Sequence, residues 1–180
     1  MNKKLSLSGL NRISSEEFKT SKKLPLVIVL DNIRSMNNVG SVFRTSDAFR
    51  VEKIFLCGIT PTPPHREINK TALGATETVD WQYKSNTKEA IEELKSKGYK
   101  IYSIEQATES IMLNEFTPPK DSPIAIIMGN EVDGVEQQVI DLSDSVIEIP
   151  QYGTKHSLNV SVTTGIVVWD IFHKLNLKLD

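Results

Sequence analysis

With 180 residues, 39% of them hydrophobic and 24% charged, the chain has the length of one packed domain and is short for two. Its formal net charge of −2 gives no overall positive field toward a polyanion, although local basic clusters can still bind one. Cys57 is the only cysteine, no apolar run approaches the roughly 20 residues that span a bilayer, and the start lacks the apolar core of a signal peptide, so we expect a cytoplasmic protein without disulfides or a membrane partner.

Six short apolar runs predict β-strands, and they lie at 26–30, 53–57, 78–83, 99–104, 124–128 and 144–149. Their apolar residues are mostly continuous rather than alternating, which is typical of strands covered on both faces. Helix-like stretches lie between them. We therefore predict an α/β fold with a mostly parallel sheet and helices on both faces, formed by residues 26–180 and preceded by a short N-terminal extension, 1–25.

Three segments are predicted to be helices. In 38–50 the apolar residues repeat with helical spacing, and 86–97 opens with Asn86 as a cap and ends before Gly98. The last helix, about 158–175, has apolar residues spread too widely for a single stripe. We expect one of its faces to lie on the sheet and the other on a second copy of the chain, as in a homodimer; a deeply buried central helix is the alternative.

Basic residues concentrate near both ends of the chain, at Lys3, Lys4, Arg12, Lys19, Lys22 and Lys23 and again at Lys174 and Lys178. Solvated chain ends explain this pattern as well as contact with RNA does.

The familiar nucleotide and metal signatures are missing. The chain contains neither a G-x-G-x-x-G nor a G-x-x-x-x-G-K-[ST] sequence. His65, His156 and His173 have no partner at metal-ligand spacing, so no metal site is predicted. His156 precedes Ser157, but without a G-x-S-x-G elbow this pair is better interpreted as part of a polar loop than as a nucleophile and its base.

A first polar segment contains Asn38, Gly40 and Arg44. Asn38 is expected to cap a helix from which Arg44, six residues later, projects. An arginine among small and apolar residues is suited to binding a phosphate or carboxylate. An ion pair with Asp47 or Glu52 is the alternative interpretation of Arg44.

Two further polar segments follow apolar strands, where open α/β sheets bind ligands. Gly129 permits close approach of a ligand to the backbone, and Glu131 either caps the next helix or holds a polar substrate. Ser157, Asn159 and Ser161 alternate at the start of the terminal helix, where backbone N–H groups are free to bind.

Together, and in this order, these segments resemble the three motifs of the SpoU (TrmH-like) family of RNA ribose 2'-O-methyltransferases, which belongs to the SPOUT superfamily. The matching residues are Asn38, Gly40, Arg44, Ala48 and Phe49 in the first motif, 127–131 and Gly134 in the second, and Ile149, Pro150 and 157–162 in the third. The resemblance covers residues 26 to about 175.

The resemblance implies a deep C-terminal trefoil knot that holds a bent S-adenosyl-L-methionine (AdoMet). The cofactor-binding residues it implies are Gln106, Met128, Gly129, Asn130, Ile149, Pro150, Gln151, Ser157 and Leu158. The catalytic residues it implies are Arg44, Asn38, Glu131, Ser157 and Asn159. It also implies a homodimer in which one subunit supplies Arg44 and the other supplies the cofactor, in agreement with the two-faced terminal helix.

By the same resemblance, Arg44 acts on the ribose 2'-hydroxyl. An arginine is an awkward base because its unperturbed pKa lies above about 12. Arg44 as a clamp on the adjacent phosphate, with the proton passing to phosphate or water, is the alternative.

Gln151 replaces the hydrophobic residue that many members have after Ile-Pro. With the Trp-bearing terminal helix, it resembles members that act on tRNA, so we expect a tRNA ribose, such as the D-loop guanosine, rather than rRNA. His65, Arg66 and Lys70, in the loop after the second strand, are expected RNA contacts or else solvated charges. The remaining alternatives are an inactive RNA-binding relative and an unrelated nucleotide-binding α/β domain.

Overall fold

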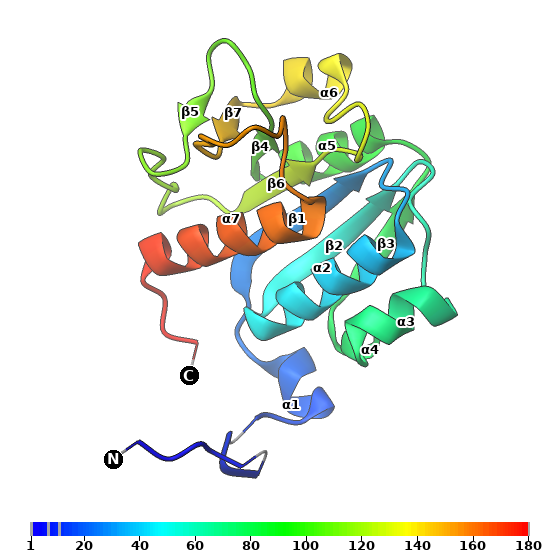
Figure 1. The fold of residues 1–180 in the computed structure, drawn as a ribbon, viewed down its shortest axis with the longest axis vertical. Coiled ribbons are helices and arrows are strands. Elements are labelled where there is room, and N and C mark those ends of the chain that lie inside the picture. Colours follow the sequence, from blue (N-terminus) through cyan, green and yellow to red (C-terminus); the bar gives the residue numbers. More distant parts are fainter. Residues whose placement is uncertain (1, 7, 11, 180) are drawn as a thin grey trace.

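The computed structural model describes residues 2–6, 8–10 and 12–179, and within them it places seven strands in one sheet (Figure 1). The strands are β1 (Leu24–Asp31), β2 (Val51–Cys57), β3 (Trp81–Lys84), β4 (Lys100–Ile104), β5 (Ile111–Met112), β6 (Ile124–Met128) and β7 (Ser145–Glu148). Their spatial order is β3-β2-β1-β6-β4-β7-β5, and every neighbouring pair is parallel. The predicted parallel sheet is confirmed. Residues 1, 7, 11 and 180 of the expected segments 1–25 and 26–180 lie outside the described residues.

Helices cover both faces of the sheet, as predicted. They are the 3-10 turn η1 (Ser8–Leu10) and the α-helices α1 (Ser15–Thr20), α2 (Met36–Ala48), α3 (Arg66–Ala72), α4 (Ala75–Thr78), α5 (Thr87–Ser96), α6 (Gln137–Leu142) and α7 (Val160–Leu175). None of the described helices is both long and apolar enough to cross a membrane.

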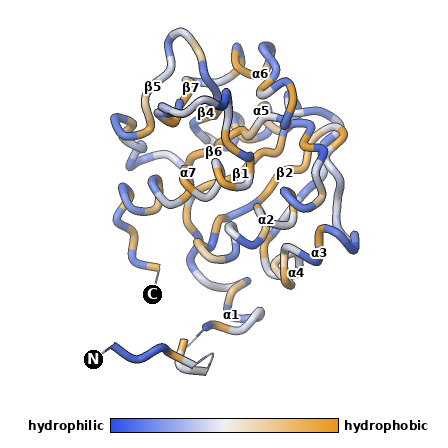
Figure 2. Tube along the Cα trace, viewed as in Figure 1, coloured by the Kyte–Doolittle hydropathy of each residue, from blue (hydrophilic) through white to orange (hydrophobic). Residues whose placement is uncertain are grey.

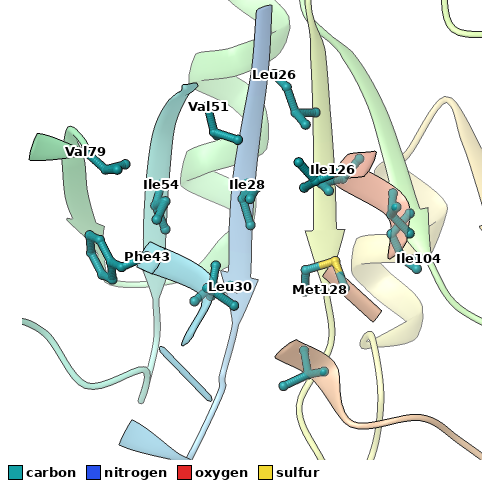
Figure 3. Packing of buried hydrophobic residues seen from close by; sticks show 14 of the residues in the cluster. Leu26, Ile28, Leu30, Phe43, Val51, Ile54, Val79, Ile104, Ile126 and Met128 are labelled. Atoms are coloured by element: carbon teal, nitrogen blue, oxygen red, sulfur yellow. The ribbon is translucent and has the colours of Figure 1, made fainter. Parts of the chain in front are cut away.

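The apolar strands are hydrophobic along their whole length because each face of the sheet has its own core (Figure 2). Successive side chains of a strand point to opposite faces. Ile28 and Leu30 of β1 accordingly lie in a cluster with Phe43 of α2 and with side chains of α3, α4 and α7 (Figure 3). Val27 and Val29 lie in a second cluster with side chains of α5 and α6.

Helix α2 begins earlier than its apolar pattern suggests. The Ser35 hydroxyl accepts a hydrogen bond from the backbone N–H of Asn38 at 3.3 Å and is the cap. The prediction that Asn38 caps this helix is therefore wrong, because Asn38 lies in its first turn, where its side chain is free to bind elsewhere. Asn86 does cap α5, since its side chain accepts from the backbone N–H of Glu89 at 3.0 Å.

The predicted strand at 78–83 and the terminal helix also differ in their limits. Thr78 ends the one-turn helix α4, which follows Gly74 in a left-handed conformation, and the chain joins the sheet only at Trp81. Helix α7 begins at Val160 rather than 158 because Asn159 is its cap. Helices α3, α4 and α6 and the two-residue β5 were not predicted, since elements this short carry little periodicity.

Helices α2 and α3 cross very closely at Gly40. A Cβ added at this glycine would lie 2.1 Å from the Thr71 hydroxyl oxygen and 2.2 Å from the Ile68 carbonyl oxygen, both in α3. The Thr71 hydroxyl also donates to the Asn37 carbonyl at 3.0 Å. This crossing places α3, with Lys70, beside the segment of α2 that carries Arg44.

Candidate functional site

A pocket of about 490 Å³ lies at the carboxyl ends of β4, β6 and β7. The loops after these three strands form its walls, together with the start of α7. Every predicted cofactor-binding residue except Pro150 lines it, namely Gln106, Met128, Gly129, Asn130, Ile149, Gln151, Ser157 and Leu158. The structure therefore brings together residues from three loops that are up to about 50 residues apart in the chain.

The loop after β6 folds back on itself. The Asn130 side-chain oxygen accepts hydrogen bonds from the backbone N–H groups of Val132 and Asp133, both at 2.8 Å. Asn130 and Gly134 also exchange two backbone hydrogen bonds. A Cβ at Gly129 would lie 2.2 Å from the carbonyl carbon of Gly134. Gly129 thus allows close approach of the chain's own backbone, whereas the sequence suggested close approach of a ligand.

Glu105 and Gln106 tie the three loops together. One Glu105 carboxylate oxygen accepts from the backbone N–H of Val135 at 2.9 Å, which joins the loops after β4 and β6. The Gln106 side-chain amide donates to the carbonyl of His156 at 2.6 Å, which joins the loops after β4 and β7. Glu105 was not predicted as a site residue from the sequence, although a carboxylate directly after a buried strand is a usable signal for one.

A chain of hydrogen bonds connects the three motif segments. The Asn159 side-chain amide donates to the Asn38 side-chain oxygen at 3.1 Å, and the Asn38 amide donates to Glu131 at 2.9 Å. The Asn159 oxygen in turn accepts from the backbone N–H of Ser161 at 2.9 Å. Asn38, Glu131 and Asn159, predicted separately, therefore lie in one network beside the pocket.

Glu131 binds the start of α2. Its carboxylate accepts from the backbone N–H groups of Arg34 at 3.0 Å and Ser35 at 3.1 Å, in addition to the Asn38 amide. Burial by itself raises the pKa of Glu131, but these hydrogen bonds hold that pKa below its usual value. The following helix, α6, has Glu136 at its cap position, so the interpretation of Glu131 as the cap of the next helix is wrong.

The segment between β7 and α7 is exposed where it borders the pocket. Ser157 and His156 both line the pocket, and every residue from Gln151 to Asn159 is exposed. Tyr152, with 97% of its surface accessible, projects from this segment. The interpretation of His156 and Ser157 as residues of a polar loop agrees with this geometry.

Arg44 lies apart from the pocket in the single chain. It projects from α2, is exposed and does not line the pocket. The alternative partners are engaged elsewhere, because Asp47 accepts from the Thr78 hydroxyl and Glu52 from the Tyr99 hydroxyl. Within the described residues Arg44 forms no hydrogen bond or ion pair, so its guanidinium is available to an external ligand.

The three suggested RNA contacts belong to a helix rather than a loop. His65 is the cap of α3, and its ring accepts from the backbone N–H of Glu67 at 3.2 Å. Arg66 and Lys70 are exposed residues of that helix. Lys70 lines a groove together with Arg44, whereas His65 and Arg66 line neither this groove nor the pocket at the strand ends.

In the described parts of the chain, no group of three or more His, Cys, Asp or Glu side chains is placed to hold a metal ion. The pocket instead offers apolar side chains, polar side chains and backbone groups at one edge of a parallel sheet. This arrangement is typical of α/β proteins that bind a small organic ligand where parallel strands end.

Comparison with known proteins identifies the family. The sequence profile of the SpoU rRNA Methylase family matches residues 25–169, and the chain belongs to this family. It is 33% identical over 165 residues to a protein of Borreliella burgdorferi named an uncharacterized tRNA/rRNA methyltransferase, covering 90% of this chain and 69% of that protein. It is 34% identical over 154 residues to the 23S rRNA (guanosine-2'-O-)-methyltransferase RlmB of Neisseria meningitidis, covering 86% and 60% respectively.

Solved structures agree with this assignment. The TrmH/SpoU tRNA modifying enzyme of A. aeolicus superposes with a TM-score of 0.78 at 26% identity, covering 89% of this chain and 80% of that one. An AdoMet-bound rRNA methyltransferase from Sinorhizobium meliloti superposes with a TM-score of 0.78 at 25% identity, covering 91% and 62%. The chain thus spans about three fifths to four fifths of the length of these proteins.

Proposed function

We propose that the chain is an AdoMet-dependent RNA methyltransferase that methylates a ribose 2'-hydroxyl, with tRNA preferred over rRNA. The observation that carries this proposal is the pocket formed by the second and third motif segments and linked by the Asn159–Asn38–Glu131 hydrogen bonds to the first. A ligand in this pocket contacts residues of two motifs directly and is one hydrogen bond away from the third.

The pocket suits AdoMet in size and chemistry. Its volume of about 490 Å³ lies in the range usual for small-molecule sites. Ile149 and Leu158 provide apolar surface for a purine, and Asn130 and Gln106 provide polar groups beside it. The AdoMet-bound state of the similar S. meliloti protein supports the same assignment.

When bound, AdoMet supplies an electrophilic methyl group whose transfer breaks the sulfur–carbon bond, forms the bond to the 2'-oxygen and leaves a neutral thioether. The protein must therefore chiefly align the ribose oxygen with the methyl carbon and accommodate the departing proton. We assign alignment of the pocket to Asn38, Glu131, Ser157 and Asn159. Arg44 binds the reacting nucleotide, and the proton passes to its phosphate or to water.

A homodimer completes this site in our proposal. Arg44 does not reach the pocket of its own chain, so a second copy must present it. The outer face of α7 supports this arrangement, because Val162, Ile166 and Trp169 are 51%, 38% and 56% exposed at positions that form one stripe. The opposite face, with Val167 and Ile171, is fully buried on the sheet. A helix buried on all sides is therefore excluded in the single chain.

The trefoil knot is also part of the proposal. The segment between β7 and α7 passes from the ends of β4 and β7, where Gln106 holds it, to the start of α2, where Asn159 meets Asn38. This path across the ends of neighbouring strands supports the proposed trefoil knot. True knots are rare in proteins.

The choice of tRNA over rRNA rests on Gln151, because the relatives are divided between proteins named for 23S rRNA and proteins named for tRNA. The test is transfer of labelled methyl from AdoMet into unmodified total tRNA and, separately, rRNA, followed by nucleoside analysis. A 2'-O-methylnucleoside in tRNA supports the full proposal, and one in rRNA alone corrects the substrate. AdoMet binding without transfer to either pool would favour the inactive relative.

A further inference from the structure

Two grooves meet at Arg44 on the outer surface of α2. The first, of about 630 Å³, lies between α1, α2 and α4 and is lined by Arg12, Arg44 and Arg50. The second, of about 520 Å³, lies between α2 and α3 and is lined by Arg44 and Lys70. Arg44 lines both grooves, so further cations extend from it toward α1 on one side and toward α3 on the other. We call Arg12, Arg44, Arg50 and Lys70 the cationic track.

The cations of this track are largely free to bind an external anion. Arg12 and Arg44 are exposed and form no hydrogen bond or ion pair within the described residues. Arg50 donates to the carbonyl of Leu179 through one guanidinium nitrogen. Lys70 lies 4.0 Å from Glu67, with both side chains well exposed, a geometry that contributes little binding energy.

Two carboxylates, Asp47 and Glu77, also line the first groove. Asp47 is occupied by the hydroxyl of Thr78, and neither carboxylate forms an ion pair with the arginines among the described residues. Three guanidinium groups therefore share a groove with two carboxylates without forming an ion pair with either of them, and within the described chain only Arg50 has a hydrogen bond elsewhere, to the carbonyl of Leu179. An arrangement of unpaired guanidinium groups favours phosphate, which each of them can bind through two parallel hydrogen bonds.

We propose that the cationic track binds the phosphodiester backbone of RNA on both sides of the nucleotide being methylated, and that Arg12 in the N-terminal extension is an RNA-binding residue. This inference rests on the proposed function, which places the target ribose at Arg44. Cations that share a groove with Arg44 then lie where the neighbouring phosphates must pass. Because phosphate contacts carry affinity and register rather than sequence information, Arg12 contributes to RNA affinity and not to the methyl-transfer step.

The test compares Arg12→Ala with Lys19→Ala in the full chain. Lys19 is the matched control because it is an exposed cation of the same N-terminal segment that lines neither groove. Binding to unmodified total tRNA and to rRNA is measured over a range of salt concentrations, together with the KM for RNA, kcat and the affinity for AdoMet. Thermal unfolding of each variant confirms that it is folded.

We expect Arg12→Ala to weaken RNA binding several-fold and to lower the slope of log affinity against log salt by about 0.7 to 0.9, the contribution of one phosphate contact. Its KM for RNA rises while kcat and AdoMet affinity stay near wild type. Lys19→Ala retains the wild-type slope. Arg12→Glu weakens RNA binding further than Arg12→Ala.

The outcomes separate this inference from the proposed function. A wild-type chain that methylates RNA, combined with equal salt slopes for Arg12→Ala and Lys19→Ala, overturns the cationic track alone. A wild-type chain that binds neither RNA pool contradicts both. A loss of kcat in Arg12→Ala at unchanged KM would instead place Arg12 at the reacting atoms and would also overturn the inference.

Discussion

Asn38 shows how one side chain joins parts of the site that are far apart in the sequence. Its oxygen accepts from Asn159 and its amide donates to Glu131, so both ends of the amide are used. Its cap function is taken by Ser35, whose hydroxyl leaves the Asn38 side chain free. The three residues are up to 121 positions apart, and no local pattern reveals that they meet.

Glu131→Gln should destabilise the protein by about 1 kcal/mol, because a neutral amide binds the N–H groups of Arg34, Ser35 and Asn38 more weakly than the carboxylate does. The folded-state pKa of Glu131 is lowered, so its stabilising effect is present above the unfolded pKa of about 4.3 and is lost as the pH falls through the folded-state pKa. The difference in unfolding free energy between wild type and variant should therefore shrink below about pH 4. Denaturant unfolding at a series of pH values measures it, with the exposed Glu92→Gln as control. A difference that grows on acidification would contradict this role.

Arg44→Ala should lower turnover by at least about a hundredfold, as expected for loss of a charge-stabilising or proton-transfer group. Affinity for AdoMet should stay near wild type, because Arg44 does not line the pocket of its own chain. The measurements are single-turnover methylation of RNA and titration with AdoMet. Lys88→Ala, an exposed cation of α5 that lines neither groove at Arg44, is the control. Near-normal turnover of the Arg44 variant would remove Arg44 from the site.

Helix α2 connects the core to the surface on which we propose that RNA binds. One of its faces, with Val39 and Phe43, is buried on the sheet; its first turn receives Glu131, and Arg44 projects from its outer surface. Its close crossing with α3 at Gly40 determines where Lys70 lies relative to Arg44. The position of α2 on the sheet therefore determines where the residues of the cationic track lie.

Gly40→Ala should destabilise the protein by about 1 to 3 kcal/mol, because the new methyl group overlaps backbone and side-chain atoms of α3 and outweighs the helix propensity of alanine. Gly153→Ala is the control, since a Cβ at Gly153 would meet nothing within 4 Å. Chemical denaturation measures both variants. If Gly40→Ala is as stable as wild type, the α2–α3 crossing must be looser than the structure indicates.

At the scale of the whole molecule, the pocket and the exposed Arg44 lie at separate places in one chain. In our proposal, the apolar stripe of α7 lies at the interface between the two copies of the homodimer. Trp169 also packs against Phe49 at the end of α2, with ring centroids 6.0 Å apart. The exposed stripe is therefore continuous with the helix that carries Arg44, which is the arrangement a shared site in a homodimer requires.

If the chain forms the proposed homodimer, Trp169→Glu should convert it to a monomer in light scattering and abolish methylation while leaving AdoMet binding measurable.

A mixing experiment tests the proposed shared site directly. Arg44→Ala and Ser157→Trp, each inactive alone, should regain about a quarter of wild-type activity when dissociated and reassembled together, because half of the dimers then contain one intact site. Without recovery in the mixed sample, both halves of the site must come from one chain.

Most of the α/β architecture follows from local sequence, because buried parallel strands are recognisable as continuous apolar runs such as 26–30 and 124–128, both confirmed within β1 and β6. The short helices α3, α4 and α6 escaped prediction because one or two turns carry no clear period. The pocket residues were found through the family motifs, and all but Pro150 line the pocket. Glu105 and Arg12 belong to no motif, and the sequence offers only a general signal for each, so their particular contacts follow from the tertiary structure alone.

Membership of the SpoU family, the parallel sheet and many of the residues that line the pocket were thus predictable from the sequence, since each depends on residue types at short, fixed spacings. The tertiary structure decided what depends on distance between remote segments. It showed that Glu131 binds the backbone N–H groups of Arg34 and Ser35 just before α2, that Gly129 accommodates the chain's own backbone, and that Arg44 lies outside the pocket of its own chain, in a groove with other arginines. Hydrogen bonds and ion pairs form between groups that lie a few ångströms apart in space. The number of residues between two groups in the sequence does not determine that distance.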